Sequence, residues 1–300
     1  MNIAVIGLGL IGGSFALAAK ARGHRVCGVD TCAATLQLAK GQLDEVSSDM
    51  SVISNARMVF AAVPMGQYEN IFAAAAKHLP PDAVLFDGAS GKREVIRAAR
   101  EKMGGKYARF VPSHPVAGDE KSGFGAARAG LFNGALAVVC PGDADDDAVE
   151  SVRALWSDIG ARVEMMDAES HDRVFAAVSH LPHLLSYALA GLIDKYEKGE
   201  KGEGGEKGEE TNTGEKEKRV LLKYAAGGFR DFTRIAGSDS ALWAEIFMSN
   251  ADRLADSARE YQQLLGEFIA LVEGGDGGEL QKHLERARRL RLRYLAENQK

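Results

Sequence analysis

Three short segments of the chain carry polar residues whose types suit proton transfer and the binding of an acid. His114 lies in "SHP", His180 and His183 lie in "SHLPH", and Arg234 lies in "FTRIAG". Histidine often acts as a general base because its pKa lies near neutral pH. Arginine can hold a carboxylate through two parallel hydrogen bonds. These segments therefore predict a site that removes a proton from a substrate carrying a carboxylate.

Both central residues have a structural alternative. His114 follows the end of a predicted strand, where a base could take a hydroxyl proton as a hydride leaves. The alternative is a histidine that only satisfies the local structure. For Arg234, the alternative is a salt bridge with Asp231 or Asp239 at a helix end.

His180 and His183 are three residues apart and are expected to share one face of a helix. Such a pair can hold a metal, but no third ligand has suitable spacing, so we predict no metal site. The two side chains are expected either to line a polar pocket or to be structural. The other four histidines are interpreted as surface or packing residues: His24, His78, His171 and His283.

The elements that must position these residues begin at the N-terminus. Residues 2–30, "NIAVIGLGLIGGSFALAAKARGHRVCGVD", predict a strand, a glycine turn, a helix and a second strand. Gly7 permits the tight turn, Gly9 lets the backbone approach a pyrophosphate, and Gly12 lets the helix pack closely on the strand. The helix N-terminus then faces the phosphates, so we predict a dinucleotide-binding βαβ unit.

Asp30 ends the second strand of this unit. A carboxylate there can accept hydrogen bonds from ribose hydroxyls and would repel a 2′-phosphate. The following residues, Thr31 and Cys32, offer no arginine for such a phosphate. We therefore predict NAD rather than NADP, with helix capping as an alternative or additional role of Asp30.

Further strands are predicted at residues 57–64, 83–90 and 135–141, separated by helices such as 66–79 and 92–103. This alternation predicts a doubly wound parallel sheet of the Rossmann type, which binds ligands beyond the carboxyl ends of its strands. Ser90 and Lys92 follow one such end, with ordinary turn chemistry as the alternative. The residues assigned to the cofactor are Gly7, Gly9, Leu10, Ile11, Gly12, Asp30, Val63 and Pro64.

From about residue 167 the pattern becomes helical. We predict a dinucleotide-binding domain over 1–166 and an all-helical domain over 167–300. Residues 195–218 consist almost wholly of Lys, Glu and Gly, which predicts a disordered insert between two helices. The helices are rich in Leu and Ala beyond what one small bundle can hide, so we expect a homodimer.

Composition excludes several other classes. The formal net charge is −5 and the pI is about 5.9, which argues against nucleic acid as a partner. Cys27, Cys32 and Cys140 form no C-x-x-C pair and suit free thiols in a reducing compartment. The apolar N-terminus lacks a basic region and breaks at Gly7, so we predict a cytoplasmic protein without a membrane span.

Taken together, the motifs resemble those of a known family. The segments "VIGLGLIGGSFALA", "DGASGK", "SHPVAGDEKSG", "SHLPH" and "GFRDFTRIAGSD" follow one another as in the prephenate and arogenate dehydrogenases of tyrosine biosynthesis. The resemblance covers nearly the whole chain except the Lys/Glu/Gly insert. It implies oxidative decarboxylation with NAD, giving 4-hydroxyphenylpyruvate from prephenate or tyrosine from arogenate. It also implies a monofunctional enzyme, since no chorismate mutase segment precedes the dinucleotide unit.

The resemblance also implies roles for individual residues. His114 accepts a hydrogen bond from the ring hydroxyl and acts as the base while hydride passes to nicotinamide. Arg234 holds a substrate carboxylate, and Ser90 and His183 line the pocket. The motif "ASGK" departs from the family, which often has valine before the lysine, so the role of Lys92 is left open.

The choice between prephenate and arogenate is expected to involve the acidic pair Asp119 and Glu120. The family often has an uncharged residue at position 119, whereas a carboxylate there could attract the ammonium of arogenate. The alternative is that Asp119 caps a helix or pairs with Lys121 in solvent. We assign His180, Asp119 and Glu120 to the substrate side of the site.

Two other readings compete. A β-hydroxyacid dehydrogenase or imine reductase would use a lysine or aspartate on the long interdomain helix, where "VFAAVSHLPHLL" instead shows histidines. A dinucleotide-sensing protein without turnover would bind NAD and form no product.

Overall fold

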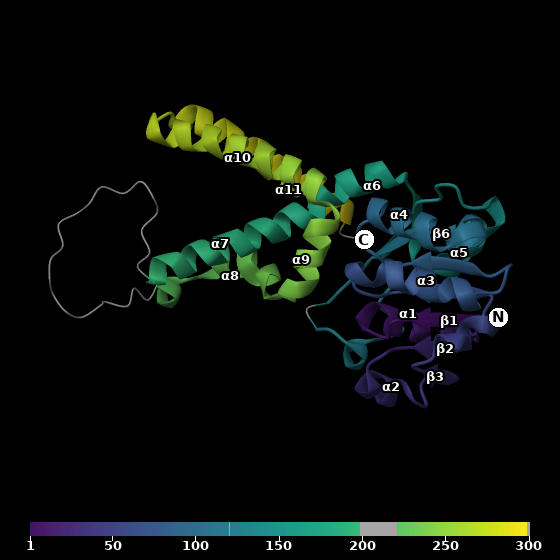
Figure 1. Ribbon diagram of the computed structural model, residues 1–300. Coiled ribbons are helices and arrows are strands. Elements are labelled where there is room, and N and C mark those ends of the chain that lie inside the picture. Colours follow the sequence, from purple (N-terminus) through teal and green to yellow (C-terminus); the bar gives the residue numbers. More distant parts are fainter. Residues whose placement is uncertain (120, 199–220, 299–300) are drawn as a thin grey trace. The chain divides into compact units, whose positions relative to one another are not determined.

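The structure is a computed structural model that describes residues 1–119, 121–198 and 221–298. Its residue contacts divide the chain into two compact units, Met1–Ala251 and Asp252–Lys300. Every residue assigned above to cofactor or substrate falls within the sequence range of the first unit. Figure 1 shows the elements of the chain.

The first unit contains a six-stranded parallel sheet in the order β3-β2-β1-β4-β5-β6. The first strand, β1, lies in the middle of the sheet. The strands β2 and β3 follow on one side of it, and β4 to β6 follow on the other. Such sheets bind dinucleotides at the point where the strand order switches sides, here between β1 and β4. The predicted parallel sheet is confirmed. Its strands are β1 (Asn2–Ile6), β2 (Arg25–Val29), β3 (Glu45–Ser47), β4 (Met58–Ala61), β5 (Val84–Asp87) and β6 (Phe110–Val111).

Helices cover both faces of this sheet because its strands are apolar on both sides. On one face, Phe60 and Phe86 pack against Phe15 and Trp156, with ring centroids 4.4 to 6.0 Å apart. On the other, the strands pack against Phe72 and its neighbours. The helices of the first face are α1 (Leu10–Ala21), α2 (Ala33–Ala39) and α5 (Asp146–Asp158), and those of the second are α3 (Tyr68–His78) and α4 (Arg93–Lys102).

A second, three-stranded sheet follows β6. It consists of β7 (Ser113–Val116), β8 (Leu136–Val139) and β9 (Arg162–Met165), with β7 antiparallel to β8. Pro112 lies between β6 and β7 and has no N–H to donate, and its carbonyl accepts from Cys140 N–H at 2.9 Å. The prediction that residues 135–141 form a strand is confirmed, but their placement in the parallel sheet was wrong.

The rest of the first unit is helical, as predicted. Between α6 and α7 the chain forms a π-helical segment, Ala176–His180. Because α7 continues through Lys198, the first four residues of the predicted disordered insert are helical, and 199–218 lie outside the described residues. The helices are α6 (Ala168–Phe175), α7 (Leu181–Lys198), α8 (Gly227–Thr233) and α9 (Ser240–Ser249).

The second unit consists of most of α10 (Ala251–Glu273) together with α11 (Gly277–Asn298). The two helices meet at Phe268 and His283, whose ring centroids are 5.7 Å apart. Many of their large apolar side chains are exposed in the single chain.

Candidate active site

The glycine turn after β1 has the geometry that a dinucleotide needs. Gly7 has φ +86°, and its N–H donates to the Val29 carbonyl at 2.8 Å. A Cβ at Gly12 would lie 1.8 Å from the Gly7 carbonyl oxygen, so only glycine lets α1 pack this closely. A Cβ at Gly9 would meet no atom within 4 Å, which leaves open space in front of the first turn of α1. The backbone N–H groups of Leu10 and Ile11 belong to that turn and suit a pyrophosphate.

Asp30 lies half-buried directly after β2. Its carboxylate accepts hydrogen bonds from Leu8 N–H and from Cys32 N–H, each at 2.8 Å. It therefore ties the glycine turn to the end of the second strand. The helix-capping alternative is not what is seen, because the N-cap residue of α2 is Cys32.

The turns after β4 and β5 lie beside the glycine turn. A Cβ at Gly88 would lie 3.5 Å from Ile11 Cγ2, so the end of β5 closely approaches the start of α1. Ser90 is half-buried in the turn after β5, and Val63 and Pro64 follow β4. These placements suit the sides of one cofactor site at the carboxyl edge of the sheet.

Helix α9 packs against the same turns. Gly66 N–H donates to Glu245 Oε2 at 3.1 Å, and a Cβ at Gly91 would lie 2.8 Å from Ser249 Oγ. The carboxyl edge of the sheet and the helical part of the first unit therefore meet where the predicted site residues lie.

A buried ion pair joins β5 to β7. The Lys92 ammonium donates to Asp87 Oδ2 and to the Ser113 carbonyl, the latter at 2.6 Å, and the side chains of Lys92 and Asp87 are fully buried. Ser113 N–H also donates to Asp87 Oδ1 at 2.9 Å, and the Trp156 indole donates to Ser113 Oγ at 3.2 Å. These contacts fix the strand that carries the next residue, His114.

His114 lies on β7 opposite Val138, with 8% of its surface exposed. Its Nδ1 is 2.9 Å from His171 Nε2, and both rings pack against Phe175 with centroids 4.6 and 4.4 Å away. Burial lowers the pKa of His114 well below 6.5, and the charges of His171 and Lys92 act in the same direction. His114 is therefore neutral at physiological pH and able to accept a proton.

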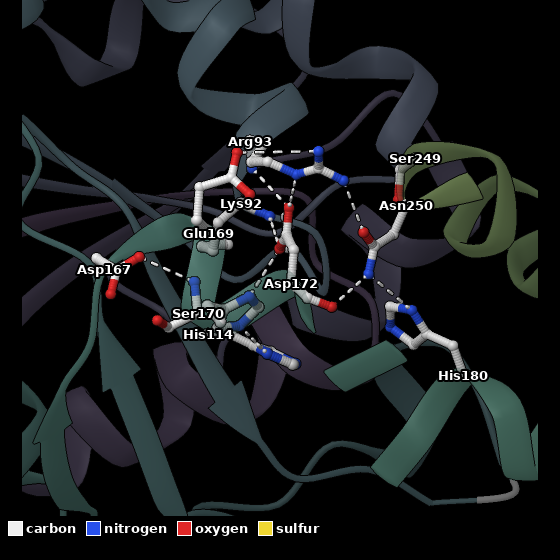
Figure 2. A network of polar contacts seen from close by, with 12 residues as sticks. Lys92, Arg93, His114, Asp167, Glu169, Ser170, Asp172, His180, Ser249 and Asn250 are labelled. Carbon is white, nitrogen blue, oxygen red and sulfur yellow. Dashed lines mark hydrogen bonds and ion pairs between the residues drawn. The ribbon is translucent and has the colours of Figure 1, made fainter. Parts of the chain in front are cut away.

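Behind His114 lies a network centred on Asp172, which is fully buried (Figure 2). Asp172 Oδ1 accepts from Lys92 N–H and faces His171 Nδ1, both at 2.8 Å. Oδ2 accepts from the backbone N–H and the Nε of Arg93 at 3.0 and 3.1 Å. Asn250 completes the network, since it accepts from Arg93 and donates to the Asp172 carbonyl.

The π-helical segment ends at His180, whose side chain is buried. His180 Nδ1 lies 3.3 Å from Asn250 Nδ2, while its Nε2 has no hydrogen-bond partner among the residues that the structure describes. Burial lowers the pKa of His180 to about 4. His180 thus joins the Asp172 network through Asn250.

His183 lies one turn into α7 and is half-buried. Its ring stacks on Trp243 of α9, with centroids 3.5 Å apart, and its Nδ1 donates to the Ser179 carbonyl at 2.9 Å. Burial lowers the pKa of His183, and the charge of Arg234 lowers it further. Arg234, which is exposed at the start of the 3-10 turn Arg234–Gly237, therefore lies within electrostatic range of His183.

Asp119 forms an ion pair with Arg128, a residue that its local sequence does not suggest as a partner. Its Oδ2 accepts from Arg128 Nη1 at 2.9 Å, and its Oδ1 is 3.4 Å from Lys121 N–H. Both side chains of the ion pair are partly exposed. Glu120 lies outside the described residues.

The structure thus places the predicted residues in two groups, one around His114 with His180 and one around His183 with Arg234. Of the two interpretations of His171, a surface residue is wrong and a packing residue is incomplete, because His171 is fully buried against Phe175 and also contacts both His114 and Asp172. Its only sequence signal is the acidic residue that follows it. Within the described ranges, no three His, Cys, Asp or Glu residues are grouped to hold a metal ion.

Family models match most of the chain. "Prephenate dehydrogenase, nucleotide-binding domain" matches residues 15–165, and "Prephenate dehydrogenase, dimerization domain" matches 167–203 and 208–286.

Individual proteins are similar over nearly the full chain. The cyclohexadienyl dehydrogenase of Zymomonas mobilis is 32% identical, over 97% of this chain and 95% of that protein. The prephenate dehydrogenase of Bacillus subtilis is also 32% identical, over 96% of this chain and 74% of that protein. Among solved structures, the A. aeolicus prephenate dehydrogenase in complex with hydroxyphenyl propionate and NAD+ is 28% identical, with a TM-score of 0.87 over 98% of each chain. The Synechocystis arogenate dehydrogenase is 28% identical, with a TM-score of 0.79 over 98% of this chain and 100% of that one.

Proposed function

This chain belongs to the prephenate dehydrogenase family, and from that premise we propose that His114 is the base of its reaction. The protein is an NAD-binding oxidoreductase of tyrosine biosynthesis with prephenate or cyclohexadienyl dehydrogenase activity. The family, the fold class and the NAD cofactor predicted from the sequence are confirmed. The observation that carries the role of His114 is a neutral, hydrogen-bonded imidazole whose neighbour Ser113 is bound to Asp87 at the carboxyl end of β5.

The proposed reaction divides the work among the residues of the site. The glycine turn and Asp30 would hold NAD+, which when bound would supply the hydride acceptor for the ring carbon that bears the hydroxyl. His114 takes the hydroxyl proton, so that a carbonyl forms at that carbon. The ring carboxylate then leaves as CO2, and its bonding electrons complete an aromatic ring that carries a phenolic oxygen.

We propose that Arg234, His183 and Ser90 bind the substrate. Arg234 is exposed and acts electrostatically on His183, a geometry that suits a carboxylate held between a guanidinium and an imidazole. His180 is proposed to limit the pocket from the buried side, where its Nε2 has no hydrogen-bond partner. We propose prephenate as the main substrate, since Asp119 is already paired with Arg128.

We further propose a cytoplasmic homodimer formed by the helical domain, which we take to begin at residue 167. The run Ala168–Lys198 is long and apolar enough to cross a membrane, yet it belongs to the matched dimerization domain and is a core helix of the enzyme. Only a small part of this run is fully buried in the single chain, and large side chains on α10 and α11 are exposed. The exposed apolar residues include Val178, Leu192, Tyr196, Leu264, Leu265, Ile269, Leu284, Leu290 and Leu292. Light scattering should give twice the chain mass of 32.1 kDa, and a monomer at micromolar concentration would contradict the proposal.

The decisive experiment is turnover by the pure protein. NAD+ is mixed with prephenate or with arogenate, NADH absorbance is followed, and the product is identified.

His114→Asn should lower kcat by roughly 10² to 10⁴, the usual contribution of a general base, with little change in substrate KM. Arg234→Gln should instead mainly raise the substrate KM, because it removes a charged contact that is present before the reaction. A His114→Asn enzyme with wild-type kcat would remove His114 from the mechanism.

A further inference from the structure

We propose that His171 and Asp172 form a hydrogen-bonded relay that fixes the tautomer of His114 and leaves its Nε2 as the atom that takes the proton. The proposal rests on the proposed role of His114 as the base. The relay runs from Asp172 Oδ1 to His171 Nδ1 at 2.8 Å, and from His171 Nε2 to His114 Nδ1 at 2.9 Å. His171 and Asp172 act through His114 and are therefore positioning residues.

The direction of the relay is set at Asp172. Three of the four nitrogens around its carboxylate can only donate: the backbone N–H groups of Lys92 and Arg93, and the Nε of Arg93. Burial of Asp172 is outweighed by these donors and by His171, so its pKa is lowered and it remains a carboxylate. A carboxylate only accepts hydrogen bonds, so the hydrogen between Asp172 and His171 must sit on His171 Nδ1.

The hydrogen between the two histidines follows from this. Burial lowers the pKa of His171, so the ring is neutral and carries one hydrogen, which is already on Nδ1. Its Nε2 therefore has a lone pair and can only accept. The contact at 2.9 Å then requires His114 Nδ1 to donate, and neutral His114 has its remaining lone pair on Nε2.

The same contacts support the charge that forms during the reaction. When His114 takes a proton, its Nδ1–H becomes a stronger donor to His171, which in turn donates to the negative charge of Asp172. The other charged groups nearby are already matched, since Lys92 contacts Asp87 and Arg93 contacts Asp172. Three further titratable groups face this region: Glu169 contacts Arg93, the Cys140 thiol lies within electrostatic range of Lys92 and Asp172, and His180 is linked to Asp172 through Asn250.

Packing and hydrogen bonds around the relay hold its groups in one arrangement. Phe175 contacts both imidazole rings. Arg93 and Asn250 both contact Asp172 and also each other (Figure 2). If His171 had a purely structural role, only the shape of its ring would matter. The relay needs in addition the hydrogen-bond acceptor at Nε2. The two roles therefore differ in how they respond to a substitution that keeps an acceptor.

The test is a direct reading of the tautomer by ¹⁵N-edited NMR of protein with labelled histidine, with signals assigned from His114→Asn and His171→Gln. In the wild type, His114 and His171 should both carry their hydrogen on Nδ1. In His171→Leu, which has no acceptor, His114 should show the Nε2–H form. In His171→Gln, whose amide oxygen can accept from His114, the Nδ1–H form should return. Phe175→Leu is the matched control, because it removes packing from both rings and should leave both tautomers unchanged.

Kinetics give the second readout. We expect His171→Leu to lower kcat about 10- to 100-fold with substrate and NAD+ KM values within about threefold, the range typical for partners that orient a reactive group. His171→Gln should recover at least about threefold in kcat over His171→Leu. An Nε2–H form of His114 in the wild type would overturn the relay, and so would a wild-type kcat in His171→Leu. Either result is distinct from an active His114→Asn enzyme, which would instead overturn the proposed base. The wild-type tautomer is measured on the unaltered protein, and only the assignment of its signals draws on the variants.

Discussion

We propose two tasks for the single carboxylate of Asp30. Its oxygens accept from Leu8 and Cys32 and so brace the glycine turn, while its negative charge stays at the end of β2 where a ribose would bind. The bracing needs only acceptor atoms, but discrimination against a 2′-phosphate needs the charge. The two tasks can therefore be separated by a substitution that keeps an oxygen and removes the charge.

We expect the wild type to use NAD at least about tenfold more efficiently than NADP, which corresponds to ~1.4 kcal/mol. In Asp30→Asn the ratio of the two kcat/KM values should shrink, because the amide keeps one acceptor and cannot repel the phosphate. The measurement is kcat/KM for both cofactors at saturating substrate. Equal efficiency in the wild type would contradict the role given to Asp30.

Asp119 is expected to contribute little to substrate choice. Its ion pair with Arg128 is partly exposed, and such pairs are typically worth about 0 to 1 kcal/mol. Asp119→Asn should therefore leave the ratio of kcat/KM for arogenate and prephenate within about threefold. Arg128→Gln is the companion variant, because it removes the partner and keeps the carboxylate. A strong shift toward prephenate in Asp119→Asn would instead place Asp119 in substrate selection.

Single residues also show where prediction from sequence ends. The types of His114 and Arg234 and the spacing of the glycines suffice to suggest a base, a carboxylate ligand and a dinucleotide turn. His171 lies 57 positions from its partner His114, and no local pattern joins the two. The relay depends on how α6 packs against β7 and the start of α4, which is tertiary information.

At the scale of elements, the glycine turn and α1 form the most predictable part of the protein. A different physical reason requires glycine at each of its three positions. Gly7 has a positive φ, Gly9 borders open space, and Gly12 packs closely against the turn. The small sheet was not predictable in the same way. Its strand β7 contains Pro115, which usually argues against a strand but is tolerated here because β7 is an edge strand.

The glycines give a matched pair of variants. Gly12→Ala would place a Cβ 1.8 Å from the Gly7 carbonyl, so the protein should lose roughly 1 to 3 kcal/mol of stability even without cofactor. Gly9→Ala meets no atom within 4 Å and should fold like the wild type, but its methyl group would occupy the space meant for the pyrophosphate. Denaturation of the cofactor-free protein and calorimetric titration with NAD+ measure the two effects. Undiminished NAD+ affinity in Gly9→Ala would show that the pyrophosphate does not approach this position.

At the scale of the whole molecule, buried histidines couple folding to pH. His114, His171 and His180 all have pKa values lowered by burial, that of His180 to about 4. In the unfolded chain they titrate near 6.5. The unfolded state therefore binds more protons below pH 6.5, and the stability present above that pH is lost as the pH falls toward 4.

We expect the free energy of unfolding to fall below pH 6.5 by up to about 1.4 kcal/mol per pH unit for each such histidine. Between pH 6.5 and 4, His180→Gln should reduce the slope of the unfolding free energy against pH by the contribution of about one proton. Above pH 7 the variant and the wild type should have the same slope. Denaturant titrations at several pH values measure the free energy of unfolding and hence its slope against pH. An unchanged slope in His180→Gln would mean that this histidine has the same pKa in the folded and unfolded chain.

The two tryptophans of the chain lie in different parts of the site. Trp156 is buried against the phenylalanine rings and donates to Ser113 beside His114, whereas Trp243 stacks on His183 of the proposed substrate pocket. Intrinsic fluorescence therefore offers an internal optical probe for each half of the reaction. With Trp243→Phe, the remaining emission comes from the indole behind the base, and with Trp156→Phe it comes from the indole on which the substrate-side imidazole rests. Changes around His114 and changes around His183 can thus be followed separately in an unlabelled enzyme.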